Sequence, residues 1–156
     1  GKIEKGDCIR LISREFPGIK ITSVEIDPTM VDIAKKYFAL DQIKDHTVLT
    51  NDACAVVADP AKFNISDHSI DMIFVDIYCG SKYPDLGETG TFLSGIKKIL
   101  KPGGLVIFNR LYIEGHRETV DAFLKRINSQ FENVISEVAP SRDNVINMLI
   151  LGHTKA

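Results

Sequence analysis

Cysteine is scarce in this sequence, and its pattern excludes a disulfide framework. The three cysteines, Cys8, Cys54 and Cys79, are odd in number and form no CxxC pair. Such usage is typical of free thiols in a reducing compartment, so we expect a cytoplasmic protein. The histidines and cysteines also lack metal-ligand spacing, and we therefore expect no metal site.

An excess of one charge and a long apolar run are also absent. The 19 basic and 21 acidic residues give a net charge of −2, which is not typical of proteins that bind polyanions. No apolar run reaches the ~18–20 residues of a membrane span. We therefore expect neither a nucleic-acid partner nor a membrane partner. With 156 residues and 44% hydrophobic content, the chain is expected to form one domain, 1–156.

Strand-like and helix-like segments alternate along the chain. Strands are expected at 19–26, 47–50, 70–75, 105–108, 134–138 and 145–151. Helices are expected at 8–16, 28–40, 53–61, 91–100 and 118–131. This order predicts an α/β, Rossmann-like, doubly wound fold, whose mostly parallel sheet carries one antiparallel strand near the C-terminus.

The apolar pattern also predicts which side chains are buried. The helix at 28–40 is expected to bury one stripe of side chains, namely Met30, Val31, Ala34, Tyr37 and Phe38. Segment 70–75 is apolar except at Asp71, as expected for a strand that is buried on both faces. Residues 101–104, Lys-Pro-Gly-Gly, are expected to form a turn with glycine at positive φ.

Acidic residues follow three consecutive expected strands. Glu25, Asp52 and Asp76 occupy these positions, and the carboxyl ends of such strands border the ligand crevice of the fold. A carboxylate can accept hydrogen bonds from the hydroxyls of ribose or the amino group of adenine, and it attracts a sulfonium or amine cation. Taken alone, each residue also suits a helix cap, and Asp52 directly precedes the helix expected from Ala53.

Five segments in this order resemble the spermidine-synthase-like branch of the class I S-adenosylmethionine-dependent methyltransferase superfamily. They are 24–28 (VEIDP), 34–38 (AKKYF), 51–53 (NDA), 71–76 (DMIFVD) and 100–104 (LKPGG). The resemblance implies that Glu25 binds the cofactor ribose and that Ile26 packs on the adenine. It also implies that Asp52 and Ala53 border the adenine, and that Asp76 is the catalytic residue beside the methionine part and the reacting group.

The glycine-rich cofactor loop of that family is altered here. Gly6 precedes Glu25 by 19 residues, close to the ~20-residue offset between such a loop and its ribose acid, and we expect Gly6 to contact the cofactor. The loop's other glycines and the strand before it do not occur in this chain. We therefore expect a fold that lacks its first strand here, and a natural protein that extends upstream of Gly1.

The residues after Asp76 bear on the reaction. Aminopropyltransferases of the family carry a second aspartate there, whereas this chain has Ile77-Tyr78-Cys79-Gly80. This difference favours a methyltransferase that uses S-adenosylmethionine and a small-molecule or protein acceptor, with Tyr78 and Tyr83 lining the acceptor pocket. Cys79 is a further candidate nucleophile, although a free thiol without a role suits it better.

Two alternatives stay open. One is a polyamine aminopropyltransferase that uses decarboxylated S-adenosylmethionine in polyamine biosynthesis. The other is a non-catalytic relative that serves as a binding or dimerisation protein, and a homodimer is the assembly that we consider for any of the three.

Overall fold

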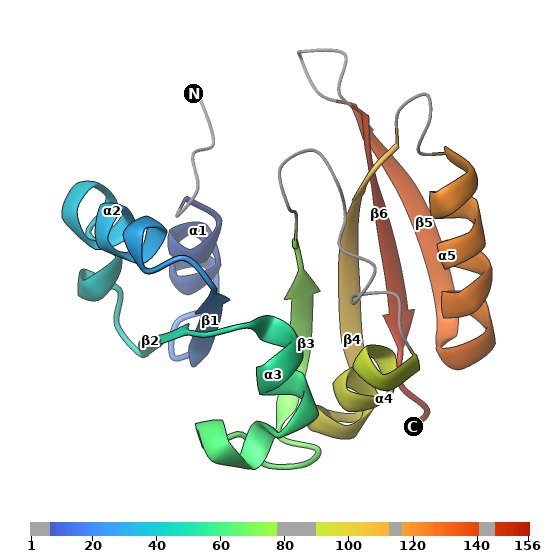
Figure 1. Cartoon of the computed structure of the whole chain (residues 1–156), viewed down its shortest axis with the longest axis horizontal. Coiled ribbons are helices and arrows are strands. Elements are labelled where there is room, and N and C mark those ends of the chain that lie inside the picture. Colours follow the sequence, from blue (N-terminus) through green and yellow to red (C-terminus); the bar gives the residue numbers. More distant parts are fainter. Residues whose placement is uncertain (1–6, 78–89, 113–116, 141–145) are drawn as a thin grey trace. The chain divides into compact units, whose positions relative to one another are not determined.

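The chain divides into two compact units, residues 1–56 (unit 1) and 57–156 (unit 2). The structure is a computed structural model that describes residues 7–77, 90–112, 117–140 and 146–156 (Figure 1). Each unit has its own sheet, so the parallel sheet expected from the sequence is present as two sheets in the described residues. The prediction of one domain over 1–156 stays a prediction.

Unit 1 contains a two-stranded parallel sheet with helices before and after its first strand. The elements are α1 (Asp7–Glu15), β1 (Ile21–Glu25), α2 (Pro28–Phe38), the short 3-10 helix η1 (Leu40–Gln42) and β2 (His46–Thr50). The register aligns Ile21 with His46 and Glu25 with Thr50. The carboxyl ends of β1 and β2 therefore lie side by side. Helix α3 (Ala53–Ala58) follows β2.

Helix α2 begins where the sequence predicts it. The Asp27 carboxylate accepts a hydrogen bond of 2.8 Å from the Thr29 amide, and Pro28 occupies the first helical turn. Both features stabilise a helix start, because the first amides of a helix have no partner within it. The helix ends at Ala39, which adopts a left-handed conformation with φ of 46°.

The predicted buried stripe of α2 is only partly correct. Val31 is 4% exposed, whereas Met30 is 37% and Tyr37 is 67% exposed. Residues 31, 34 and 38 follow the three- and four-residue spacing of one helix face. Met30 and Tyr37 each precede a member of that face by one residue, which turns them by about 100° toward solvent.

Unit 2 contains a four-stranded sheet. Its elements are the 3-10 helix η2 (Pro60–Phe63), β3 (Ile70–Val75), α4 (Gly90–Ile99), β4 (Leu100–Leu111), α5 (Arg117–Gln130), β5 (Glu132–Pro140) and β6 (Ile146–His153). The strand order is β3-β4-β6-β5. Strands β3 and β4 are parallel, and β6 is antiparallel to both of its neighbours. The predicted reversed strand near the C-terminus is confirmed.

One face of this sheet packs against α5. Phe108 of β4 and Phe123 of α5 meet edge to face, with ring centroids 5.1 Å apart. Gly152 of β6 lies so close to α5's end that an added Cβ would come 2.9 Å from the Phe131 side chain. Helix α4 lies next to the same end of α5, since Lys97 Nζ is 6.0 Å from the Phe131 ring. Phe108, Phe123 and their neighbours Leu93, Ile96, Leu100, Val106, Val120, Ile127 and Ile150 are fully buried.

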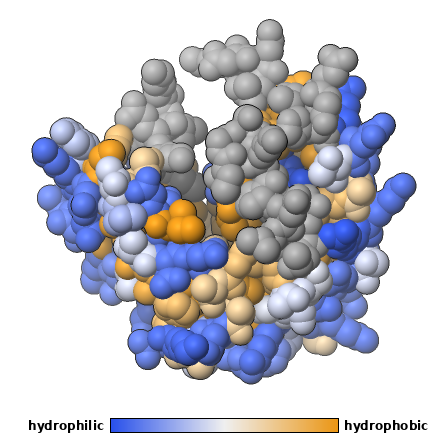
Figure 2. Space-filling model, in the orientation of Figure 1, coloured by the Kyte–Doolittle hydropathy of each residue, from blue (hydrophilic) through white to orange (hydrophobic). Residues whose placement is uncertain are grey.

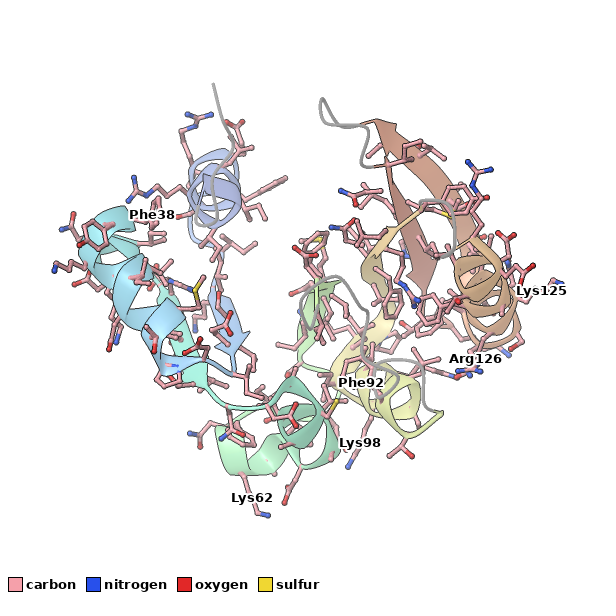
Figure 3. The ribbon with its side chains drawn as sticks, turned by 45° about the horizontal axis from the view of Figure 1, so that its top comes forward. Phe38, Lys62, Phe92, Lys98, Lys125 and Arg126 are labelled. Atoms are coloured by element: carbon pink, nitrogen blue, oxygen red, sulfur yellow. The ribbon has the colours of Figure 1, made fainter. Side chains whose placement is uncertain are left out.

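The outer side of α5 is hydrophilic. Lys125 and Arg126 point away from the ribbon in Figure 3, and both residues are exposed. Figure 2 shows hydrophilic residues along this side of the molecule. Helix α5 is therefore amphipathic.

The prediction that β3 is buried on both faces is wrong. Met72 is 39% and Phe74 is 47% exposed, whereas Val75 is 4% exposed. Successive side chains of a strand point to opposite faces. Met72 and Phe74 point to the face opposite α4 and α5, and no helix among the described residues of unit 2 covers that face.

The Lys-Pro-Gly-Gly segment lies within β4 rather than before it, and so the predicted strand at 105–108 is too short. The pairing with β3 passes from Ile70–Leu100 directly to Met72–Leu105, which leaves extra residues on β4 as a bulge. Gly103 has a φ of 72°, as predicted. The Thr154 hydroxyl donates a hydrogen bond of 2.6 Å to the Lys101 carbonyl and closes the bulge.

Among the described strands, β1 and β3 each pair with a single strand. Within the described residues, β1 pairs with β2 and β3 pairs with β4, and neither β1 nor β3 has a strand on its other edge.

None of the described helices combines the length and apolar character that crossing a membrane requires.

Candidate functional site

The carboxyl ends of β1 and β2 bring four predicted site residues to one edge of unit 1. We call Glu25, Ile26, Asp52 and Ala53 the β1/β2 edge. Glu25 is the last residue of β1, and the Asn51 amide donates a hydrogen bond of 3.0 Å to its carbonyl. This bond continues the parallel pairing beyond the strands. It holds the turn that carries Asp52 and Ala53 next to Glu25.

Glu25 is a half-buried residue that presents a carboxylate at this edge. Its Oε1 accepts a hydrogen bond of 3.0 Å from the Asp27 amide, and no other described residue donates to the carboxylate. The side chain of Ile26, directly beside it, is 67% exposed. A carboxylate with unused acceptor sites next to an exposed apolar side chain can bind a sugar hydroxyl and a flat apolar ring.

Asp52 caps helix α3. Its Oδ1 accepts a hydrogen bond of 2.9 Å from the Cys54 amide, and the Val56 amide donates to its carbonyl at 3.0 Å. The capping role that the sequence left open is therefore confirmed. The cap uses one carboxylate oxygen, and a carboxylate has further acceptor sites for a ligand. Ala53, the first residue of α3, is half-buried.

The Cys54 thiol is poorly suited to act as a nucleophile. Its burial, and then the neighbouring Asp52 carboxylate, raise its pKa above the ordinary value of 9.0. At neutral pH the thiol is therefore protonated, and the thiolate is the reactive form. Cys54 forms no disulfide.

Asp76 lies in unit 2, directly after β3, with its side chain exposed. Its Oδ1 accepts a hydrogen bond of 3.0 Å from Asn109 Nδ2 of β4. Asn109 is not among the residues that the sequence pattern predicted. The signal was present, since Asn109 directly follows the predicted strand at 105–108, just as Asp76 follows the strand before it. Parallel neighbours place such residues at the same edge.

The three predicted carboxylates therefore belong to two parts of the chain. The structure brings Glu25 and Asp52 together in unit 1 and places Asp76 beside Asn109 in unit 2, and the grouping of all three stays a prediction. Gly6, Tyr78, Cys79 and Tyr83 lie outside the described residues. The described residues contain no group of three His, Cys, Asp or Glu side chains that could hold a metal ion.

A comparison with known protein families identifies the family of this chain. The family model for the spermine/spermidine synthase domain matches residues 6–153, which cover both units. The chain belongs to the spermine/spermidine synthase domain family. This result confirms the resemblance on which the predicted site rests, without testing the individual residues.

Two proteins that are similar to this chain carry the names of two kinds of group transferase. A probable polyamine aminopropyl transferase of Bifidobacterium longum is 31% identical over 129 residues, which are 82% of this chain and 27% of that protein. The human eEF1A lysine and N-terminal methyltransferase is 31% identical over 131 residues, which are 78% of this chain and 18% of that protein. The expected group-transferase family is confirmed, and the relatives point to both reactions.

The fold of the family is confirmed by solved structures. A probable spermidine synthase from Corynebacterium glutamicum superposes with a TM-score of 0.78 at 22% identity, over 94% of this chain and 52% of that chain. This chain thus spans about half of that protein and smaller shares of the two sequence relatives. The predicted α/β class with a mostly parallel sheet and one antiparallel strand is correct.

Proposed function

We propose that the protein carrying this chain is an S-adenosylmethionine-dependent methyltransferase of the spermidine-synthase-like type. In this proposal, Glu25 accepts hydrogen bonds from the ribose hydroxyls, and Ile26 contacts the adenine ring. Asp52 and Ala53 border the adenine, and Asp76 lies next to the sulfonium. The acceptor is a small molecule or a protein.

The surroundings of Asp76 support methyl transfer over aminopropyl transfer. Aminopropyl transfer to an amine requires deprotonation of an ammonium group, whose free pKa is about 10, and nearby acceptors assist this step. Asp76 is followed by the apolar Ile77, and the described side chain that contacts it is the neutral amide of Asn109. One carboxylate beside a neutral amide provides less proton-accepting capacity than two carboxylates.

The chain's residues would act through positioning and electrostatics. When bound, the cofactor supplies an electrophilic methyl group on a sulfonium. The β1/β2 edge fixes the nucleoside, and the negative charge of Asp76 favours a cationic group at the carboxyl end of β3. The acceptor's bond to the methyl carbon would form as the carbon–sulfur bond breaks, with S-adenosylhomocysteine as the leaving group, and the acceptor would give up a proton. Holding the reacting atoms in line is a large part of such catalysis.

An aminopropyltransferase is the second candidate. The spermine/spermidine synthase domain match and the Bifidobacterium longum relative favour it. In that case decarboxylated S-adenosylmethionine would occupy the same nucleoside site, and a small-molecule amine would enter next to Asp76.

Cofactor preference and product identity separate the candidates. Calorimetric titration of the complete protein with S-adenosylmethionine and with its decarboxylated form measures the preference. We expect tighter binding of S-adenosylmethionine and, with an acceptor, release of S-adenosylhomocysteine. Release of methylthioadenosine would instead establish the aminopropyltransferase. A protein that binds neither form would be the non-catalytic relative.

The Glu25→Ala variant tests the nucleoside site. Loss of hydrogen bonds to a charged group should weaken cofactor binding by roughly tenfold to a hundredfold. Glu15→Ala is the matched control, because Glu15 is an exposed glutamate of unit 1 whose carboxylate pairs with Arg14. Unchanged affinity of Glu25→Ala would remove Glu25 from the site.

A further inference from the structure

Asn109 and Asp76 form a side-chain pair at the carboxyl ends of two parallel strands. The register of β3 and β4 aligns Val75 with Phe108. Asp76 and Asn109, which follow these two residues, therefore lie opposite each other. Asn109 Nδ2 donates to Asp76 Oδ1 at 3.0 Å. The contact joins positions 33 residues apart, which makes it a product of the sheet rather than of a local turn.

The backbone of Asn109 is held from both sides. Strand β4 pairs with β3 on one edge and with β6 on the other, where Asn109 lies opposite Leu149. The residues on either side of Asn109 anchor the opposite face of the strand. Phe108 packs on Phe123, and the Arg110 guanidinium lies 4.5 Å from the centre of the same ring. Asn109 is therefore a half-buried amide on an inner strand.

Asp76 is less restrained by its own segment. It lies one residue beyond β3, and its side chain is exposed, so rotation about its side-chain bonds would change where its charge points. The amide of Asn109 fixes one oxygen. Because the amide is neutral, it orients the carboxylate without cancelling its charge, whereas a lysine or arginine there would compete with a cationic ligand.

We propose that Asn109 is a positioning residue that orients the Asp76 carboxylate toward the positively charged part of the ligand. This inference rests on the proposed function, because Asp76 acts on the ligand and Asn109 acts through Asp76. Asn109 thus joins the site as a residue that sets the orientation of the Asp76 carboxylate. The proposal predicts that Asn109 has no effect on the ligand when the Asp76 carboxylate is absent.

The test is a double-mutant cycle on the complete protein. We measure the calorimetric affinity for S-adenosylmethionine and its decarboxylated form, together with the turnover of the preferred one, in wild type, Asn109→Ala, Asp76→Ala and the double variant. Asn109→Ala should lower kcat/KM by roughly tenfold to a hundredfold, since a hydrogen bond to a charged group is lost. Adding Asn109→Ala to Asp76→Ala should then cause no further loss of affinity or activity.

Three further variants separate positioning from a structural role. Asn109→Gln keeps an amide donor and should recover part of the lost activity, whereas the isosteric Asn109→Asp replaces the donor with a second negative charge and should not. Asn147→Ala is the matched control, because Asn147 is a half-buried asparagine on β6, opposite Leu111. It should stay within about twofold of wild type, as is usual for a site without a special role.

The outcomes separate this inference from the proposed function. If wild type binds neither cofactor form, the proposed function fails, and this inference fails with it. If wild type is active but Asn109→Ala is unchanged, only the inference fails. The inference also fails if the losses in the double variant multiply, because Asn109 would then act independently of Asp76.

Discussion

The two compact units bury apolar side chains to different extents. Unit 2 has a four-stranded sheet, and its fully buried residues come from two of the strands, β4 and β6, and from the helices α4 and α5. Unit 1 has a two-stranded sheet, and its buried hydrophobic residues in the described part of the chain are Val31, Leu40 and Val56. Sheets of two strands depend on helices and local bonds for stability. We infer from this difference that helix caps and turns fix the position of the β1/β2 edge, whereas a packed sheet fixes the position of Asp76.

Phe123→Ala should cause the largest loss of stability, and it tests whether the core of unit 2 lies between its sheet and α5. Phe123 is 1% exposed and contacts both Phe108 and Arg110. Its loss should lower the free energy of unfolding by about 3–5 kcal/mol, measured by urea denaturation. Phe74→Ala is the control, because that ring is 47% exposed and should cost clearly less. Equal losses would show that the α5 face is not the principal core.

Gly95→Ala should cause the next largest loss of stability, and it tests how tightly unit 2 is packed. A Cβ at this position of α4 would lie 2.4 Å from the Val57 side chain and 2.7 Å from its carbonyl oxygen. We expect a loss of about 1–3 kcal/mol, because a backbone atom cannot easily move away. Gly90→Ala, at the start of α4, meets open space and should change the melting temperature little. A neutral Gly95→Ala would mean that α3 and α4 are loosely packed.

Asp27→Ala tests whether caps hold unit 1 together. The variant removes the bond to the Thr29 amide and should cost about 0.5–2 kcal/mol. Hydrogen exchange should accelerate first in the opening turn of α2. Asp27→Asn keeps an acceptor oxygen and is the control. If exchange in α2 does not change in Asp27→Ala, the cap does not limit the stability of unit 1.

Asp52→Asn should have the smallest effect and concerns the Cys54 thiol. Burial is the larger cause of the raised thiol pKa and the Asp52 carboxylate the smaller, so this change should lower the pKa only in part. The pH dependence of alkylation measures it, in a Cys8→Ser, Cys79→Ser background. An unchanged pKa would show that burial alone protects the thiol.

The same shift has a consequence for stability. A group with a raised folded-state pKa stabilises the protein below its unfolded pKa, and this contribution is lost as pH rises through the folded pKa. Cys54 should therefore reduce stability only above about pH 9, its ordinary value. The Cys54→Ser variant should lack this alkaline component in urea titrations.

Local signals predicted the elements well. Asp27 and Pro28 mark the start of α2, and the apolar run at 70–75 gives β3 its observed bounds. Parallel pairing likewise places Glu25 and Asp52 at one edge, as their positions after two strands indicate.

Long-range packing was not predictable from the same signals. A run of apolar residues does not reveal that no described helix of unit 2 covers one face of β3, so the exposure of Met72 and Phe74 was not predicted. The bulge that places Gly103 inside β4 depends on Thr154, about fifty residues away. The contact of Asn109 with Asp76 depends on strand register, which single-strand patterns do not contain.

The position of β6 in the sheet constrains how unit 2 forms. Strand β6 comes after the other described strands in the sequence, yet it lies between β4 and β5. Among the described strands, β5 therefore has no ladder partner while the ribosome is still translating residues before 146. The loop from β4 to β6 must close around α5 and β5, and such distant pairing slows folding. In a nascent chain, β4 and β5 would therefore stay unpaired with each other until β6 inserts between them.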